Sequence, residues 1–303
     1  MRVLVTGSTG LIGREVVLAG LKSGQTVYAG WHERKPEFGT PVQLDITNVD
    51  SIRRALETDP DVVIHLAALT DVDGCELDEA SAYKLNCLAT ERLATEADGR
   101  GIHFIFVSTD YVFDGNKGLY CEDDSPSPVN RYGWSKLRGE EAVRTKSRNW
   151  CIVRTSTPYG LHPFRSSFAV FLAEKLTALE EVSVVSDQFT SPTYTVDLAY
   201  ALLDVAKRKI TGMLHVSGSV RCSRLDFAIS LAKQLSLDAH LIRPVLMSEI
   251  SWKAFRPRDS SLNVDRAAGL LGSKPQPLLD SLRRFAEQYA DWQTKPDAYR
   301  KKG

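Results

Sequence analysis

The sequence predicts an α/β fold: a Rossmann doubly wound parallel sheet with a smaller C-terminal part. Three observations carry this prediction. A short apolar strand at the N-terminus enters a glycine-rich turn at residues 6–13. Apolar runs and helical patterns then alternate through the first half of the chain. After Tyr159 the pattern loosens, but no repeat or low-complexity linker separates the second half. We therefore expect the second half to lie on the carboxyl edge of the sheet.

The first half contains short apolar runs of strand length, which predict strands at residues 3–6, 25–30, 42–45, 62–66, 102–108 and 151–154. Helical spacing predicts helices at 11–22, 51–57 and 80–99, and one that begins near Arg131, after a loop with Pro126 and Pro128. Runs that are apolar throughout indicate strands buried on both faces. We therefore expect a parallel sheet that is covered by helices on both sides.

The second half continues with both kinds of element. Helical spacing predicts helices at residues 168–179, 196–207, 224–235 and 277–292, and extended runs predict strands at 182–185 and 212–216. Residues 256–262 read as a polar loop, and the last three residues are expected to fray.

Composition excludes several classes of protein. The 303 residues carry 38 basic and 38 acidic side chains, so the chain gives no support for a nucleic-acid or membrane-surface partner. We see no apolar run near the ~18 residues of a membrane span, and Met1 leads directly into a strand, not a signal peptide. Five scattered cysteines suit a cytoplasmic protein with reduced thiols. The six dispersed histidines show no metal-ligand spacing, so we predict no metal.

The glycine-rich turn is the first candidate site. Gly7 allows the tight turn off the first strand, Gly10 lets a pyrophosphate approach the backbone, and Gly13 lets the helix pack on the sheet. Phosphates would face the N-terminus of the helix, where amide groups and the helix dipole favour anions. Thr9, Leu11 and Ile12 belong to the same expected contact set.

The residues after the second strand bear on which nicotinamide cofactor binds. An acid at the end of this strand would bind the ribose of NAD, but the position near Gly30 is followed by Trp31, His32, Glu33, Arg34 and Lys35. Arg34 and Lys35 could hold a 2′-phosphate, whereas Glu33 argues for NAD. We expect NADP(H) to be preferred, with NAD(H) as the alternative, and place His32 and Arg34 at the cofactor.

Two further segments are expected at the cofactor. Asp45 and Ile46 follow the third strand and are placed to contact adenine, and Ala67 and Ala68 follow the fourth strand and would pass under the cofactor. His65 is expected to be structural. We assign residues 1–160 to an NAD(P)-binding Rossmann domain and 161–303 mainly to a substrate-binding part, with some segments returning to the Rossmann core.

Tyr132 and Lys136 form the second candidate site, together with Thr109 at the end of an apolar run. Residues i and i+4 share one face of a helix, so Tyr132 and Lys136 can point into one pocket. An ammonium group beside the phenol would lower the pKa of Tyr132 from its usual ~10 towards the range useful for acid catalysis. Lys136 can also bind the nicotinamide ribose, and the hydroxyl of Thr109 can hold a substrate carbonyl. These residues predict a carbonyl reductase.

The chain resembles the extended short-chain dehydrogenases/reductases, and more closely the dTDP-4-dehydrorhamnose reductase family. The resemblance covers nearly the whole length and rests on the turn at 6–13, Ser-Thr-Asp-Tyr-Val-Phe-Asp-Gly at 108–115, the segment 128–140, Asp-Gln-Phe-Thr-Ser-Pro-Thr at 187–193 and Arg-Pro-Arg-Asp-Ser-Ser-Leu at 256–262. It implies that Thr109, Tyr132 and Lys136 are catalytic, that Asp110 and Tyr111 border a sugar, and that Arg256 closes the sugar-nucleotide side of the cleft.

The activity that the resemblance implies is NAD(P)H-dependent reduction of a nucleotide-linked 4-keto sugar, dTDP-4-dehydro-L-rhamnose first among them, and a homodimer is compatible with it. The chain departs from the family at Thr157, where a Trp is common, and at Pro275-Gln276-Pro277-Leu278, where the family often has Pro-x-Trp.

Two alternatives stay open. Residues 30–38 resemble the regulatory subunit of methionine adenosyltransferase, which would bind NADP and a partner enzyme without turnover. A nucleotide-sugar epimerase or dehydratase shares the scaffold, but such dehydratases have Asp-Glu where this chain has Asp110-Tyr111.

Overall fold

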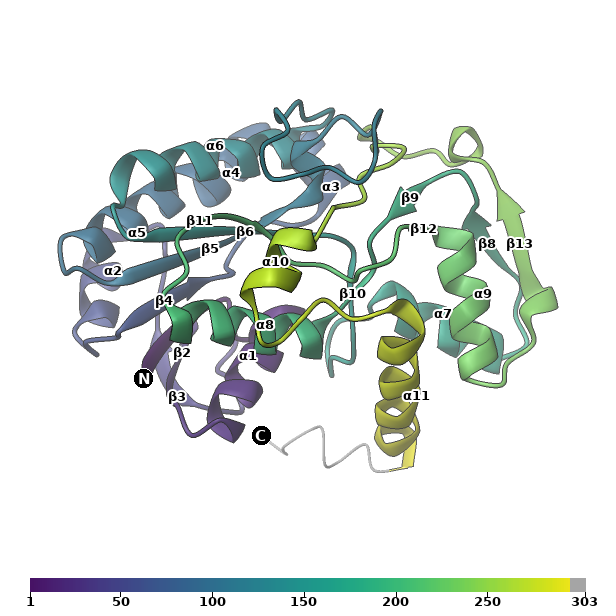
Figure 1. The fold of residues 1–303 in the computed structure, drawn as a ribbon, viewed down its shortest axis with the longest axis horizontal. Helices are drawn as coiled ribbons and strands as arrows, with labels where there is room; N and C mark the ends of the chain where they lie inside the picture. The colour runs from purple at the N-terminus through teal and green to yellow at the C-terminus, as the bar shows by residue number, and fades with distance from the viewer. Residues whose placement is uncertain (295–303) are drawn as a thin grey trace.

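Seven parallel strands form the central sheet of the computed structural model, which describes residues 1–294. The strands are β1 (Arg2–Thr6), β2 (Thr26–Trp31), β3 (Thr40–Gln43), β4 (Val62–His65), β5 (His103–Thr109), β6 (Trp150–Thr155) and β11 (Gly212–His215). Their order across the sheet is β11-β6-β5-β4-β1-β2-β3, and every neighbouring pair is parallel. This confirms the predicted doubly wound α/β fold (Figure 1).

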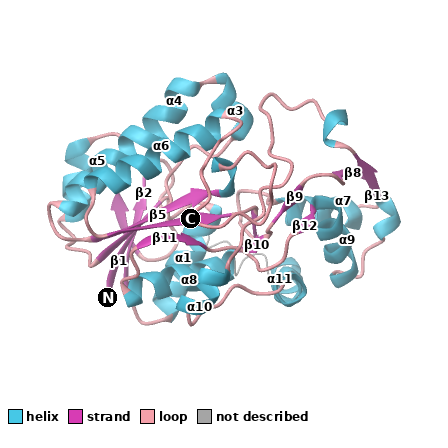
Figure 2. Cartoon of the chain, turned by 45° about the horizontal axis from the view of Figure 1, so that its top comes forward, coloured by secondary structure: helices cyan, strands magenta, loops and turns pink. Residues whose placement is uncertain are grey.

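Helices cover both faces of the sheet (Figures 1 and 2). The bounds are α1 (Leu11–Lys22), α8 (Thr195–Arg208) and α10 (Asp265–Leu270) on one side, and α2 (Val49–Leu56), α5 (Ala89–Asp98) and α6 (Arg131–Lys146) on the other. Successive strand side chains point to opposite faces, so in β1 Val3 and Val5 pack with α1 and α8 while Leu4 joins the cluster under α5. Both faces are therefore filled with apolar side chains.

The second half of the chain builds a smaller lobe with its own core, at the right of Figure 1. It contains α7 (Phe168–Thr177), α9 (Arg224–Gln234), α11 (Leu278–Thr294), and β8 (Val182–Val185) paired with β13 (Ile242–Val245). Tyr159, Phe227 and Phe285 stack edge to face in its centre. Short pairs join the lobe to the sheet: β7 (Pro158–Tyr159) with β10 (Thr193–Tyr194), and β9 (Phe189–Thr190) with β12 (Cys222–Ser223). In addition, β11 and α8 return from the second half to the main sheet.

The predicted helix at 80–99 is wrong as a single α-helix. The structure has α4 (Glu79–Tyr83), a π-helical turn over Lys84–Leu88, and then α5. The wide turn carries Asn86, whose amide donates to Leu69 O (2.9 Å) and to Ser135 Oγ (2.9 Å). π-Turns inside helices often mark functional sites, and here the turn ties this helix to the loop after β4 and to α6.

Other elements differ from expectation at their ends or were not predicted. β3 begins at Thr40 and ends at Gln43, so Asp45 lies in the loop beyond it. α3 (Val72–Leu77), β13 and 3₁₀ turns at Asp110–Val112, Ala239–Leu241 and Met247–Glu249 had no clear pattern in the sequence. Among residues 1–294, no helix combines the length and apolar character that crossing a membrane requires. The predicted fraying of residues 301–303 lies outside the described residues.

Candidate active site

The glycine-rich turn lies at the carboxyl edge of the sheet, between β1 and β4. The strand order reverses there, because β2 and β3 extend from one side of β1 and β4 from the other. Ligands of open α/β sheets bind in the crevice at such a switch point. The turn is therefore where a dinucleotide would be held.

The geometry of the turn fits a dinucleotide. Gly7 has φ +64°, and a Cβ there would lie 2.8 Å from Ala67 N, while a Cβ on Gly13 would lie 2.1 Å from Gly7 O. A Cβ on Gly10 would meet only Gly7 O at 3.3 Å, so the other side of Gly10 is open. Gly10 caps α1 without a side-chain hydrogen bond, which leaves the first amides of the helix for a phosphate.

Thr6 and His65 hold the loop after β4 against this turn. Leu66 N and Ala67 N both donate to Thr6 Oγ1 at 3.1 Å, and His65 Nδ1 lies 2.7 Å from the same oxygen. Burial, together with the charge of Lys136, lowers the pKa of His65 to about 3. His65 is a neutral, fully buried structural residue, and Ala67 and Ala68 are half-buried beside Gly7.

The predicted adenosine contacts lie past the ends of β2 and β3. His32 and Arg34 are exposed, and Ile46 is buried. Asp45 accepts hydrogen bonds from the backbone and hydroxyl of Thr47 (2.8 and 2.7 Å), which lower the pKa of its carboxyl. The guanidinium of Arg34 lies 3.7 Å above the ring of Phe164, which comes from the second half of the chain.

Thr109 and Tyr132 come together at the carboxyl end of β5. The hydroxyl of Thr109 lies close enough to Tyr132 to act on the pKa of its phenol, and the ring of Tyr111 packs edge-on against Tyr132 with centroids 6.0 Å apart. Thr109 is buried to 7% exposure. Tyr132 is in the first turn of α6, whose N-cap Asn130 accepts a hydrogen bond from Gly133 N (2.8 Å). Two hydroxyl groups therefore face one position where a carbonyl oxygen can bind.

Lys136 lies one turn further along α6 and is 3% exposed. Its ammonium donates to Val107 O (2.9 Å) and lies 4.1 Å above the ring of Phe106. Burial lowers the pKa of Lys136 to about 7, although the charge of Glu140 acts in the opposite direction. Lys136 is thus poised between its charged and neutral forms near neutral pH.

The expected lowering of the pKa of Tyr132 by Lys136 is wrong for this structure. Burial raises the pKa of Tyr132 well above its ordinary value, and the hydroxyl of Thr109 offsets only part of this shift. The reason is geometric, since Lys136 points at the carbonyl of Val107. Tyr132 is therefore a protonated phenol that has a proton to donate, although its pKa lies further from the working pH than that of an ordinary tyrosine.

Asp110 is a buried residue that hydrogen-bonds to Thr109 and holds it in place. It is 2% exposed, and its carboxylate accepts hydrogen bonds from Thr109 (3.1 Å), Ser156 (2.8 Å) and Ser260. Burial raises the pKa of Asp110 to about 6, and the three hydroxyl groups act against this shift. Asp110 links β5 to β6 and to the 256–262 loop, so its carboxylate is engaged within the protein and not displayed to a sugar.

A cationic group lies near Tyr111, because the charges of Arg224 and Arg256 both act on the pKa of this tyrosine. The backbone of Arg224, at the start of α9, donates to Gln188 O (3.0 Å), and its guanidinium lies 4.8 Å from the ring of Phe168. Burial lowers the pKa of Arg224, and the nearby charge of Arg256 acts in the same direction. No carboxylate among residues 1–294 forms an ion pair with Arg224. Such a guanidinium favours an anionic ligand.

Arg256, by contrast, is held by Asp73 of α3. Its Nη2 lies 3.0 Å from Asp73 Oδ1, and the same oxygen accepts from Lys253 N (3.2 Å) and Ala254 N (2.9 Å). Burial alone would raise the pKa of Asp73, but these amides and Arg256 lower it. Asp73 therefore shapes the loop that carries Arg256 towards Arg224.

The structure thus adds Asp73, Gln188 and Arg224 to the predicted site. Gln188 Oε1 is buried without a hydrogen-bond partner in the protein, while Gln188 Nε2 donates to Pro257 O (3.2 Å). The sequence marks Gln188 only through the 187–193 motif, and Arg224 only as the first residue of the predicted helix at 224–235. The described residues contain no cluster of His, Cys, Asp and Glu that could hold a metal ion.

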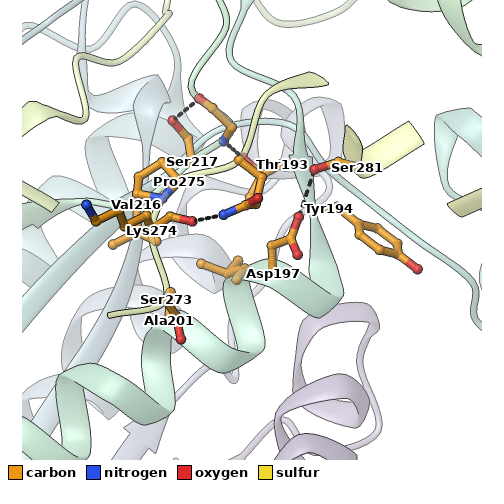
Figure 3. A pocket seen from close by; sticks show the side chains of 13 residues that line it. Thr193, Tyr194, Asp197, Ala201, Val216, Ser217, Ser273, Lys274, Pro275 and Ser281 are labelled. Carbon is orange, nitrogen blue, oxygen red and sulfur yellow. Dashed lines mark hydrogen bonds between the residues drawn. The ribbon is translucent and has the colours of Figure 1, made fainter. Parts of the chain in front are cut away.

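A small cavity lies between α8 and residues 273–276 (Figure 3). Thr193, Asp197 and Ser281 border it, together with Lys274 and Pro275. Its volume of about 10 Å³ has room for roughly one water molecule. This packing gap coincides with the segment where the chain departs from Pro-x-Trp, and it is too small for a sugar nucleotide.

Comparison with known proteins agrees with this geometry. A solved structure of dTDP-4-dehydrorhamnose reductase from Bacillus anthracis in complex with NADP superposes with a TM-score of 0.85 at 30% identity, over 95% of this chain and 99% of that chain. The "Probable low-salt glycan biosynthesis reductase Agl14" of Haloferax volcanii is 36% identical over 298 residues, 96% of this chain and 99% of the relative. Methionine adenosyltransferase 2 subunit beta of Mus musculus is 31% identical, over 88% of this chain and 81% of the relative. A family model described as the RmlD substrate binding domain matches residues 1–291, and the chain therefore belongs to this family.

Proposed function

We propose that this oxidoreductase reduces a nucleotide-linked 4-keto sugar, with dTDP-4-dehydro-L-rhamnose as the leading substrate, dTDP-L-rhamnose as its product and NADPH as the preferred reductant. Residues 1–160 hold the cofactor, and residues 161–303 mainly hold the substrate. The observation that carries the proposal is the pair of hydroxyl groups on Thr109 and Tyr132, at the same sheet edge as the glycine turn.

The catalytic step follows from these two hydroxyl groups. The substrate carbonyl oxygen binds between Thr109 and Tyr132, which orients and polarises the carbonyl. When bound, the cofactor supplies the hydride that reduces the carbonyl carbon. Tyr132 donates its phenolic proton to the oxygen as negative charge develops there, and it recovers a proton from solvent. Because Tyr132 is protonated throughout the physiological range, it is always ready to donate.

Lys136 and Asp110 contribute to this step without contacting the carbonyl oxygen. Lys136 uses one N–H to bind Val107 O, which leaves its other hydrogens for the ribose of the cofactor. Asp110 accepts from Thr109, and Tyr111 N donates to Thr109 Oγ1 (3.2 Å), so these two contacts hold Thr109 beside Tyr132. When the substrate binds, the hydroxyl hydrogen of Thr109 turns from Asp110 to the carbonyl oxygen. In this account Asp110 is a positioning residue and Lys136 binds the cofactor.

The nucleotide part of the substrate is held by Arg224 and Arg256. Arg256 has one carboxylate partner, Asp73, and Arg224 has none among residues 1–294. The remaining positive charge of the two guanidinium groups matches the negative charge of a diphosphate. Tyr111 packs against Tyr132 and also interacts with Gln188 and the two arginines, so the sugar would lie along Tyr111 between the diphosphate and the keto group. The relatives that are named as reductases are consistent with this arrangement.

Methionine adenosyltransferase 2 subunit beta supports a second candidate, because it covers most of this chain. In that case the site would bind NADP and stabilise a surface for a partner enzyme. Incubation with NADPH and dTDP-4-dehydro-L-rhamnose separates the two functions. Formation of dTDP-L-rhamnose, with slower reaction when NADH replaces NADPH, supports the proposed reductase. Binding of NADPH without any sugar product would favour the second candidate.

A further inference from the structure

The loop at residues 160–167 reaches from the second half of the chain to the glycine-rich turn. Its base is closed by Ser167 Oγ, which donates to Gly160 O (2.8 Å). Near its tip, His162 Nε2 lies 3.0 Å from Thr9 O in the turn. The loop thus contacts a segment that holds the cofactor, although it lies outside the N-terminal cofactor domain.

His162 fixes the direction of this loop. Phe164 N donates to His162 Nδ1 (3.2 Å), so the ring nitrogen that faces Thr9 O carries the hydrogen. Burial lowers the pKa of His162 to about 4, and the charges of Arg14, Arg165 and Arg34 contribute to this shift. Neutral His162 therefore donates to Thr9 O and accepts from Phe164 N, and so connects the two residues.

Phe164 and Arg34 meet at the end of this link. Phe164 is 55% exposed, yet the guanidinium of Arg34 covers its ring at 3.7 Å. Among residues 1–294, neither Arg34 nor Arg165 has a carboxylate within ion-pair distance. Arg14, by contrast, is paired with Glu37 at 3.5 Å. Two guanidinium groups from different lobes, neither with a carboxylate partner among the described residues, therefore both lie close enough to His162 for their charges to lower its pKa.

We infer that residues 162–165 form the second half of the site for the 2′-phosphate of NADP(H): Phe164 positions Arg34, and Arg165 supplies a second guanidinium to the phosphate. This inference rests on the proposed use of a nicotinamide dinucleotide, and it extends the site into the substrate-binding lobe. A flat guanidinium stacked on an aromatic ring is pre-oriented for two-point contact with a phosphate, so Phe164 acts through Arg34 as a positioning residue.

The test is equilibrium binding to the purified protein, which needs no sugar substrate. The probes are NADPH, NADH and adenosine 2′,5′-bisphosphate, and the variants are Phe164→Leu, Phe164→Tyr and Arg165→Ala. We expect Phe164→Leu to weaken NADPH about threefold by loss of the cation–π contact, and Arg165→Ala to weaken it roughly five- to tenfold. NADH affinity should hardly change. Phe164→Tyr keeps the aromatic face and should keep the ratio of NADPH to NADH affinity.

Two surface substitutions serve as controls. Phe171→Leu removes a half-exposed aromatic ring from α7, and Arg283→Ala removes an exposed cation from α11. Neither should change the ratio. An unchanged ratio in both Phe164→Leu and Arg165→Ala, with the ratio lost in Arg34→Ala, would confine the phosphate site to the loop after β2 and overturn the inference. Because cofactor binding is measured directly, the experiment tests the phosphate site even if the protein does not reduce the proposed sugar.

Discussion

Glu140 of α6 and Arg154 of β6 form an ion pair that is closed to solvent. Arg154 Nη2 lies 2.7 Å from Glu140 Oε2, and the two side chains are 1% and 0% exposed. Ser108, next to Thr109, donates to the same carboxylate (2.6 Å). Glu140 also lies one turn after Lys136, so this pair fixes the helix of Tyr132 and Lys136 to the two strands beneath it.

Replacing Glu140 by Gln should therefore destabilise the protein. The substitution keeps the shape but leaves Arg154 as a buried charge without its partner, which typically costs about 3–5 kcal/mol in free energy of unfolding. Urea unfolding measures the loss. Glu141→Gln is the control, since its pair with Arg138 is 46% exposed on both sides and is worth about 0.5 kcal/mol or less. Equal losses in the two variants would show that the buried pair has no special role.

The low pKa of Lys136 predicts how stability depends on pH. An unfolded lysine titrates near ~10.4, whereas burial holds the pKa of Lys136 at about 7 in the folded protein. Above the folded pKa the unfolded chain binds more protons, so the free energy of unfolding rises with pH, by up to about 1.4 kcal/mol per unit. Below the pKa that Lys136 has in the folded protein, the free-energy cost of burying its positive charge is fully present.

Lys136→Met removes this titration. We expect wild-type protein to gain stability relative to Lys136→Met between about pH 7 and pH 9, as measured by denaturant unfolding at several pH values. Parallel stability curves for the two proteins would mean that Lys136 keeps an ordinary pKa.

Gly13→Ala tests the packing of the cofactor turn. The added Cβ would lie 2.1 Å from Gly7 O, so α1 or the turn must move, and we expect at least a tenfold loss of NADPH affinity as the phosphate-facing amides are displaced. Gly269→Ala in α10 is the matched control, because its Cβ would meet nothing within 4 Å. Its stability should be equal or up to about 1 kcal/mol higher, with unchanged NADPH binding. Normal affinity in Gly13→Ala would exclude the turn as the pyrophosphate site.

Asp73→Asn tests the loop that carries Arg256. Loss of the carboxylate frees Arg256 and weakens three hydrogen bonds to the loop, so we expect roughly tenfold weaker binding of dTDP, by the usual worth of one charge-assisted contact. Calorimetric titration with dTDP measures the change, and NADPH binding should stay normal. Glu79→Gln, whose partner Arg131 is exposed, should bind dTDP as wild type does. If both variants bind dTDP equally well, Asp73 does not organise the nucleotide site.

Most strands and helices of the main sheet can be predicted from the sequence by elementary rules. Buried parallel strands are continuous apolar runs, and the glycines of the turn, the Thr109 strand end and the Tyr132–Lys136 pair each carry a local pattern. The doubly wound parallel sheet and the shared site of Thr109 and Tyr132 follow from these patterns. The π-turn at Lys84–Leu88 has no such pattern, because it depends on the contacts of Asn86 with Leu69 and Ser135.

The rest of the site depends on contacts between residues far apart in the chain. Asp73 meets Arg256, and His162 meets Thr9, only after the two lobes pack together. The pairing of β8 with β13 is likewise set by tertiary structure. The pKa of Tyr132 could not be predicted from helical spacing, since spacing does not show that Lys136 points at Val107.

The most direct test of the account is the oxidation of NADPH in the presence of dTDP-4-dehydro-L-rhamnose, followed in wild-type protein and in Tyr132→Phe. We expect turnover in the wild type and a loss of about 10²- to 10⁴-fold in the variant, the usual contribution of a general acid, with NADPH binding unchanged. Equal turnover in the two proteins would contradict the assignment of Tyr132 as the proton donor.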